Sequence, residues 1–218
     1  MKILILDVET ENTGYDIMAD NKRLLSVQIG DSNKQELYYA DAPSHDSLLV
    51  RAKERIYGLL NDETVFSGHN LTGFDTPMLE KFLDIKIPKK NLLDLSKTQL
   101  VTNICQLRNR NTLRLEELCS HLGINSSHKD EMNQKAETYK TRPEIVAQAQ
   151  AAARDLVSRR GWSFNFSLGY SIDKIAGGHA IYDSYKDFVA SKGSENTLFY
   201  RYATGDIVSE YELLRRSR

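Results

Sequence analysis

The chain has 218 residues and a formal net charge of −1, from 29 Lys and Arg against 30 Asp and Glu. Its composition, 40% hydrophobic and 27% charged, is ordinary for a globular protein and excludes wholesale disorder. The length favours one domain with additions over two full domains. The near-zero charge argues against a strongly basic nucleic-acid binder. It does not exclude a nucleic-acid enzyme, because metal-binding carboxylates can offset a basic groove.

The cysteines and the apolar runs indicate in which cellular compartment we expect the protein. Cys105 and Cys119 form no CxxC pair, so we expect reduced thiols in a reducing compartment and no zinc site. The apolar run Ile3–Leu6 ends at Asp7, which is too short for a secretory signal, and no run approaches the ~18 residues of a membrane span. We therefore expect no membrane partner and a cytoplasmic protein.

The first half of the chain alternates short apolar runs with amphipathic stretches. We expect strands at 2–7, 24–30, 36–40, 65–67 and 92–95, with the second and third forming a hairpin around Asp31-Ser32-Asn33. We expect helices at 44–60, 74–83 and 112–122, and a loop at 68–73 between the fourth strand and the second helix.

The second half is harder to assign. Residues 125–142 are polar and predict an exposed loop, and a helix follows from a capping-box pair, Thr141 and Glu144, to Gly161. Aromatic and apolar residues then alternate over 162–170, which is strand periodicity, 171–195 has no clear pattern, and 197–216 predicts a last helix. This order is α/β. We expect a single domain over 1–218, in which 125–196 is an insertion of uncertain role.

Four carboxylates lie either at the ends of the predicted elements or on a predicted buried face. Asp7 and Glu9 are two apart at the end of the first strand, so both project to one face. Asp75 begins a helix, and Asp206 lies on an otherwise largely apolar face of the last helix, four residues after Tyr202. Gly205 next to it weakens that helix, which suggests close approach of another backbone or a substrate.

The chemistry that suits these groups is phosphodiester hydrolysis with two metal ions. A buried carboxylate is costly unless something compensates its charge, and Mg²⁺ prefers oxygen ligands. Two ions roughly 3.5–4 Å apart would hold the attacking and leaving oxygens, and a tyrosine hydroxyl beside them could orient the attacking water. Each of the three short patterns is common by itself; their order and context make the set informative.

At these residues the chain resembles the DEDD, or DnaQ-like, superfamily of 3′→5′ exonucleases, which has an RNase H-like fold. The first motif resembles LILDVET at 4–10, the second NxxxFD at 70–75 and the third YxxxD at 202–206. The resemblance covers about 1–124 and 197–218. It implies that Asp7, Glu9, Asp75 and Asp206 ligate two Mg²⁺ or Mn²⁺ ions.

The third motif distinguishes the tyrosine version of this family from the histidine version. The latter carries HxxxxD, which neither His128 nor His179 provides at the required spacing. The resemblance is therefore to the tyrosine subfamily, as in proofreading domains of DNA polymerases, and implies that Tyr202 positions the nucleophilic water.

The resemblance also implies contacts with the substrate. Thr10, with its neighbours in the main chain, is placed to meet the terminal sugar. Phe74 is either a core residue, which is the more usual case, or one of the apolar residues that family members set against the terminal bases. Asn70 either hydrogen-bonds the substrate or braces its loop. The aromatic residues at 162–170 form either a stacking platform for single-stranded bases or, as the more usual case, the buried side of an amphipathic strand.

The expected activity is metal-dependent 3′→5′ hydrolysis of single-stranded or frayed DNA ends, which releases nucleoside 5′-monophosphates. The alternatives are an RNA-directed nuclease or an endonuclease of the same fold, the proofreading domain of a longer DNA polymerase, and a silent nucleic-acid-binding module. The partners would be a DNA 3′ end and, in the proofreading case, a polymerase. The setting would be nucleoid-associated, or the host cytoplasm for a phage protein.

Overall fold

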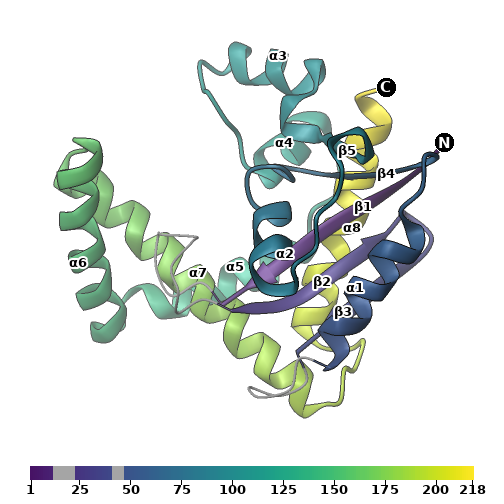
Figure 1. The fold of residues 1–218 in the computed structure, drawn as a ribbon. Helices are drawn as coiled ribbons and strands as arrows, with labels where there is room; N and C mark the ends of the chain where they lie inside the picture. Colours follow the sequence, from purple (N-terminus) through teal and green to yellow (C-terminus); the bar gives the residue numbers. More distant parts are fainter. Residues whose placement is uncertain (12–22, 41–46) are drawn as a thin grey trace. The chain divides into compact units, whose positions relative to one another are not determined.

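A computed structural model describes residues 1–11, 23–40 and 47–218 (Figure 1). The chain divides into two compact units. Unit 1 comprises Met1–Glu9, Leu24–His128 and Arg201–Arg218. Unit 2 comprises Lys129–Tyr200 with Thr10–Arg23, of which 12–22 lie outside the described residues. The second unit thus corresponds closely to the expected insertion at 125–196, while the assignment of 1–218 to one domain stays a prediction.

Unit 1 is built on a five-stranded mixed sheet in the order β3-β2-β1-β4-β5. The strands are β1 (Lys2–Thr10), β2 (Leu24–Gly30), β3 (Gln35–Tyr39), β4 (Thr64–Gly68) and β5 (Leu92–Asp94). β1 runs parallel to β4 with Leu4 opposite Phe66, and β2 pairs antiparallel with β3 with Gln28 opposite Leu37. The predicted strands and hairpin are therefore confirmed.

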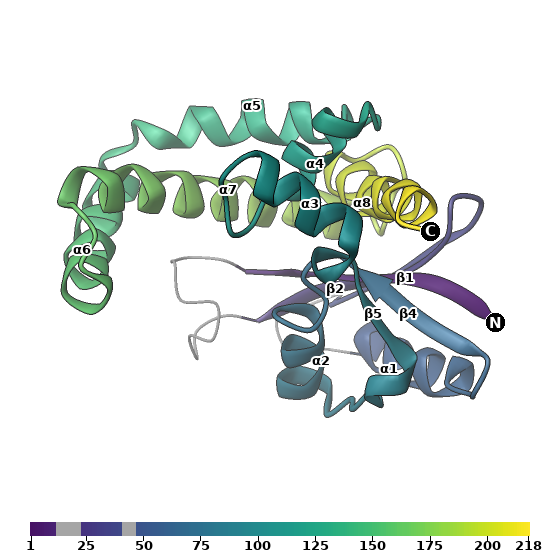
Figure 2. The ribbon, with the colours of Figure 1, turned by 90° about the horizontal axis from the view of Figure 1, so that it is seen from above.

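Helices cover both faces of this sheet (Figure 2). On one face lie α1 (Ser47–Leu59) and α2 (Asp75–Leu83), and on the other lie α4 (Leu115–Leu122) and α8 (Leu198–Arg216). Short 3₁₀ turns, η1 (Lys89–Asn91) and η2 (Leu95–Lys97), flank β5, and α3 (Gln99–Leu107) is a helix that the sequence pattern did not predict. The α/β class is confirmed.

The core beside α8 explains why that helix lies against the sheet. Ile5 of β1 is fully buried in one apolar cluster with Ile207, Leu213 and Leu214 of α8 and with Leu118 of α4. Burying side chains of this size contributes roughly 1.5–3 kcal/mol each. This cluster also contains both cysteines, which are free thiols, as expected.

Unit 2 is helical where the sequence pattern predicted a loop and a strand. The polar stretch 125–142 contains α5 (His128–Lys140), in which Met132, Ala136 and Tyr139 are buried at helical spacing. α5 packs on α7 (Phe164–Ala190): the Tyr139 hydroxyl donates to Asp183, and the ring of Tyr139 stacks on that of His179 at 6.0 Å. The loop prediction failed because few large apolar residues mark the buried side.

The predicted strand over 162–170 is wrong, because these residues form a helix start. Ser163 caps α7, its hydroxyl accepting from the Phe166 amide. Trp162 makes edge contacts with Phe166 and Tyr170, at ring distances of 5.1 and 5.6 Å. Alternating residues include every fourth residue, so a short window of this kind also fits a helix. Phe166 is 59% exposed, which rules out a buried strand and leaves the stacking platform as a prediction.

α6 (Pro143–Arg160) confirms the best-marked helix of the second half, but not its predicted cap. The helix begins after Arg142, which makes no side-chain capping bond, and Pro143 occupies the first turn, so the capping box predicted from Thr141 and Glu144 is wrong. The C-terminus is as predicted: Gly161 adopts φ 66° after Arg159 and Arg160.

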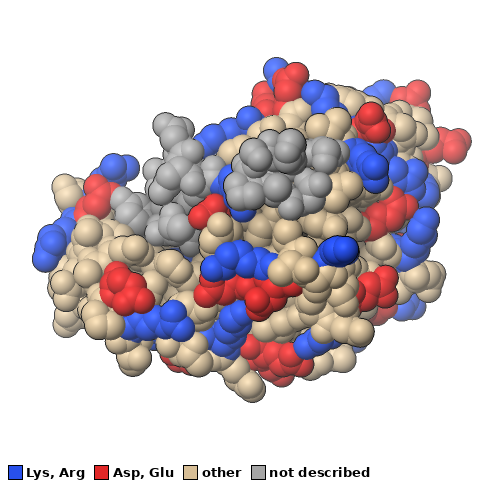
Figure 3. Space-filling view, turned by 90° about the horizontal axis from the view of Figure 1, so that it is seen from below, with Lys and Arg blue, Asp and Glu red and all other residues tan. Residues whose placement is uncertain are grey.

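The near-zero net charge is reflected in the distribution of charged residues on the surface. On the face shown in Figure 3, Lys and Arg are interspersed with Asp and Glu, without a large region of one sign. In the described ranges 1–11, 23–40 and 47–218, no helix has both the length and the apolar character needed to cross a membrane.

Candidate metal centre

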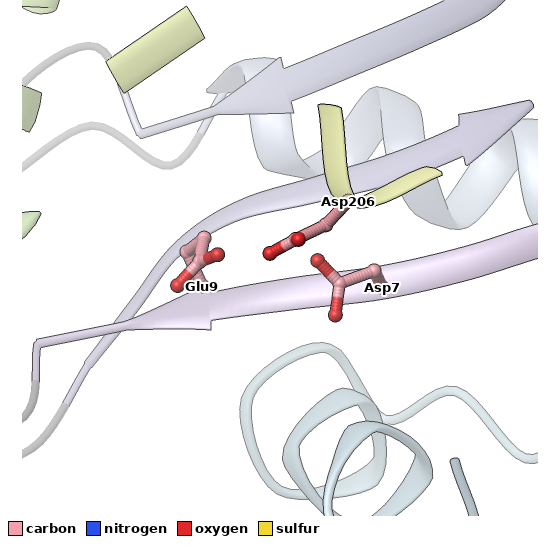
Figure 4. Close-up of side chains that lie close together, drawn as sticks. All are labelled: Asp7, Glu9 and Asp206. Carbon is pink, nitrogen blue, oxygen red and sulfur yellow. The ribbon is translucent and has the colours of Figure 1, made fainter. Parts of the chain in front are cut away.

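Three carboxylates converge where β1 passes α8. Asp7 and Glu9 come from β1 and Asp206 from α8, and the three side chains point toward one another (Figure 4). Each offers an oxygen that lies within 4.8 Å of the others. Glu9 and Asp206 are buried, and Asp7 is partly exposed. Three acidic groups at this distance repel one another strongly unless a cation lies between them.

Strand alternation accounts for the position of this cluster. Ile5, Asp7 and Glu9 lie on the same face of β1, and Ile5 packs in the core with Ile207 of α8. The apolar core therefore gives way to carboxylates along one strand face, against the same helix. The i, i+2 spacing of the first motif places Asp7 and Glu9 on one face of the strand, as the sequence predicted.

Asp75 lies beside the three but is not one of the converging set. It begins α2 and is 3% exposed, and its Oδ1 accepts a 3.1 Å bond from the amide of Val8, between Asp7 and Glu9. Burial raises the pKa of Asp75 well above its usual value, and the charges of Asp7 and Glu210 raise it further. The fourth predicted carboxylate is thus held against β1 by the backbone.

Glu210 is a fifth carboxylate that sequence reasoning missed. It is 3% exposed, one helical turn after Asp206, and its Oε1 accepts a 3.0 Å bond from the amide of His69. This bond ties α8 to the loop that follows β4. Two acidic residues at i, i+4 on a buried helix face are unfavourable, and this was the signal that could have identified it.

The loop before Asp75 is held by Asp94, at the end of β5. The Asp94 carboxylate accepts bonds from the amides of Asn70 and Thr72, at 3.1 and 3.0 Å. Burial acts to raise the pKa of Asp94, but hydrogen bonds from Ser96 and Thr72 outweigh it, and the pKa is lowered. The backbone of Asn70 has φ 63°, which asparagine tolerates better than most residues. Asp94 therefore fixes the shape of the loop that leads to the site.

The predicted substrate-contact residues and Tyr202 differ in their exposure to solvent. Asn70 is exposed, Phe74 is partly buried as the residue before α2, and Thr10 is buried as the last residue of β1. Tyr202 is partly exposed on α8, one turn before Asp206, as the spacing predicted. The centroid of its ring lies 6.5 Å from that of the His128 ring. The substrate contacts of Thr10, Asn70 and Phe74 stay predictions.

His128 is a second residue of the site that the sequence pattern did not reveal. Its Nε2 lies 2.9 Å from Oδ1 of Asp206. The search for a histidine motif in the sequence failed because His128 precedes Asp206 by 78 positions and comes from a different helix. No short motif can report such a pair.

A family model described as 3′-5′ exonuclease (DNA_pol_A_exo1) matches residues 4–158. The match covers more than half of the chain and contains Asp7, Glu9 and Asp75, whereas Tyr202 and Asp206 lie beyond it. The mixed five-stranded sheet with flanking helices is consistent with the RNase H-like fold of such exonucleases. A search of the curated proteins found no match.

Proposed function

Because the chain belongs to the 3′-5′ exonuclease family, we propose that it hydrolyses phosphodiester bonds at the 3′ end of single-stranded or frayed DNA and releases nucleoside 5′-monophosphates. The observation that carries this proposal is the convergence of Asp7, Glu9 and Asp206 within 4.8 Å. Asp206 is distant in sequence from the other two and outside the matched segment, yet it completes the acidic cluster.

The residues present fit divalent cations. The donors are carboxylate oxygens, which Mg²⁺ and Mn²⁺ prefer, and the buried carboxyl group of Asp75 lies within electrostatic reach of Asp7 and Glu210. We propose two ions, held by Asp7, Glu9, Asp75 and Asp206. When bound, two such ions would lower the pKa of the attacking water and offset the charge that develops on the phosphate during in-line displacement.

The protein groups have separate roles in this proposal. The β1 backbone holds Asp75 through the Val8 amide, so its orientation is set before substrate binds. The Tyr202 hydroxyl would orient the attacking water, as in the tyrosine subfamily. Thr10, Asn70 and Phe74 would contact the terminal nucleotides. The phenol role is supported by the helical register that sets Tyr202 one turn from Asp206.

The test is digestion of 5′-labelled oligonucleotides in Mg²⁺ or Mn²⁺. Wild type should shorten single-stranded DNA one nucleotide at a time, and Asp206→Asn should be inactive but folded. Asp130→Asn, an exposed acidic residue on α5, is the matched control and should retain activity. Tyr202→Phe should slow single turnover while Mn²⁺ binding persists. An Asp206→Asn protein that digests at the wild-type rate would overturn the proposal.

Substrate variants separate the alternatives within the same assay. A blocked 3′ end should stop the reaction, whereas an endonuclease would still cut. A matched RNA oligonucleotide should be digested more slowly than DNA. Binding without any hydrolysis in either metal would indicate a silent binding module. Faster digestion at a mismatched primer end than at a paired end would support a proofreading role beside a DNA polymerase.

A further inference from the structure

One imidazole contacts the carboxylate that completes the acidic cluster. His128 begins α5, its side chain is only 13% exposed, and its Nε2 lies 2.9 Å from Oδ1 of Asp206. A carboxylate that binds a metal ion is ionised and can only accept a hydrogen bond, so in that state the imidazole N–H is the donor. His128 lies in the same compact unit as the cluster.

Gly205 makes room for this ring. A Cβ built on Gly205 would lie 2.4 Å from Cγ, 2.6 Å from Cδ2 and 2.8 Å from Cβ of His128. Real Cβ contacts essentially never fall below 3.0 Å, so any other residue at 205 would displace the ring. Glycine is among the least favourable residues within a helix. The close approach that Gly205 suggested in the sequence is thus found to a side chain, that of His128.

Orientation of the carboxylate is what such a contact controls. Asp206 stands on α8 and can turn about its side-chain bonds, and each rotation changes which oxygen faces Asp7 and Glu9. The His128 ring packs against Gly205, and its N–H donates to Oδ1 of Asp206, which restricts that rotation. Hydrogen-bond partners of this kind, behind a ligating carboxylate, commonly set metal affinity by factors of 10–100.

We propose that His128 is a positioning residue that orients Asp206 for binding of a divalent cation, with Gly205 as the position that admits its ring. The inference rests on the proposed function, because it needs Asp206 to be a ligand. It adds a residue from a helix start that no motif of the sequence identifies, and it explains why the last helix carries glycine at 205.

The experiment measures Mn²⁺ binding directly, by electron paramagnetic resonance of the free ion, on the full-length protein. His128→Phe keeps a ring but lacks the donor, and it should weaken Mn²⁺ binding about 10–100-fold. His128→Gln keeps an N–H donor of similar reach and should stay within a few-fold of wild type. His121→Ala, at an exposed histidine on α4, is the control and should bind as wild type does.

A double-mutant cycle tests the steric part. Gly205→Ala should weaken Mn²⁺ binding in the wild-type background, because the new methyl group displaces the ring. In the His128→Ala background the same substitution should have no further effect, so the two changes should be strongly non-additive. Additive effects would overturn the claim that Gly205 acts through His128.

The outcomes separate this inference from the proposed function. If Asp206→Asn binds Mn²⁺ as tightly as wild type, the metal site itself is wrong. If Asp206→Asn abolishes binding but His128→Phe binds as wild type does, the metal site stands and the positioning role is refuted. A His128→Gln protein as weak as His128→Phe would show that ring shape, and not the donor, matters, which also refutes it.

Discussion

Neutralising one carboxylate of the cluster should stabilise the metal-free protein while it removes activity. We choose Asp7→Asn, which keeps the shape of the side chain. Oxygens of Asp7, Glu9 and Asp206 lie within 4.8 Å of one another. Two unit charges at that distance repel by about 3.5 kcal/mol at an effective dielectric constant of about 20.

Water reduces this figure, because Asp7 is partly exposed. We therefore expect the free energy of unfolding in excess chelator to rise by about 1–3 kcal/mol. For a protein of this size that corresponds to a Tm higher by roughly 2–12 °C. In Mg²⁺ this difference should shrink, because wild type gains about 2.7 kcal/mol per site at one hundred times Kd, and the variant gains less.

The assay is thermal and urea unfolding of both proteins, with chelator and with Mg²⁺. Asp130→Asn removes an exposed charge and is the control, which should change stability by less than about 0.5 kcal/mol in either condition. If Asp7→Asn is less stable than wild type in chelator, the cluster is not electrostatically strained and the reasoning is refuted.

Three further predictions concern unit 1. Arg55 lowers the pKa of Glu36 to about 2, so the pair should add stability above the ordinary value of 4.5 and lose it as pH falls toward 2. Because the Arg55 side chain is 38% exposed, we expect the pair to contribute only about 1 kcal/mol to the free energy of unfolding. Urea unfolding should show this as a difference between wild type and Glu36→Gln at pH 6 that vanishes near pH 2. A difference that stays the same at both pH values would count against the prediction. Gly68→Ala should destabilise by about 1–3 kcal/mol, because its Cβ would lie 2.7 Å from the Leu6 carbonyl, whereas Gly58→Ala meets open space and should stabilise α1 by about 0.5–1 kcal/mol. Asn70→Gly suits φ 63°. If the side chain bonds substrate, KM should rise about 2–10-fold with stability preserved, whereas an unchanged KM with lower stability would show that Asn70 braces its loop.

The carboxylates show how far local pattern carries a prediction. Alternation along β1 sets Asp7 and Glu9 on one face, and the helical register of α8 sets Tyr202 one turn from Asp206. Both are properties of a few neighbouring residues, so they are legible in the sequence. The apolar runs of β1, β2 and β4 predicted the central strands for the same reason.

Unit 2 shows where local pattern is ambiguous. α5 buries Lys129, Met132, Ala136 and Tyr139, a set with too little apolar character to mark a helix. α7 begins with aromatics spaced both two and four apart, and continues with small buried residues such as Ser167 and Ser171. Helices of this kind are decided by packing between α5, α6 and α7, which is a property of the tertiary structure.

What the sequence alone determined is the identity and local direction of the acidic side chains of the candidate site, because strand and helix periods act over a few residues. Only the tertiary structure decided which distant groups meet: Glu210 accepts a bond from the His69 amide, and His128 contacts Asp206. Those contacts join segments 141 and 78 positions apart. Long-range packing places them, and no spacing rule along the chain records it.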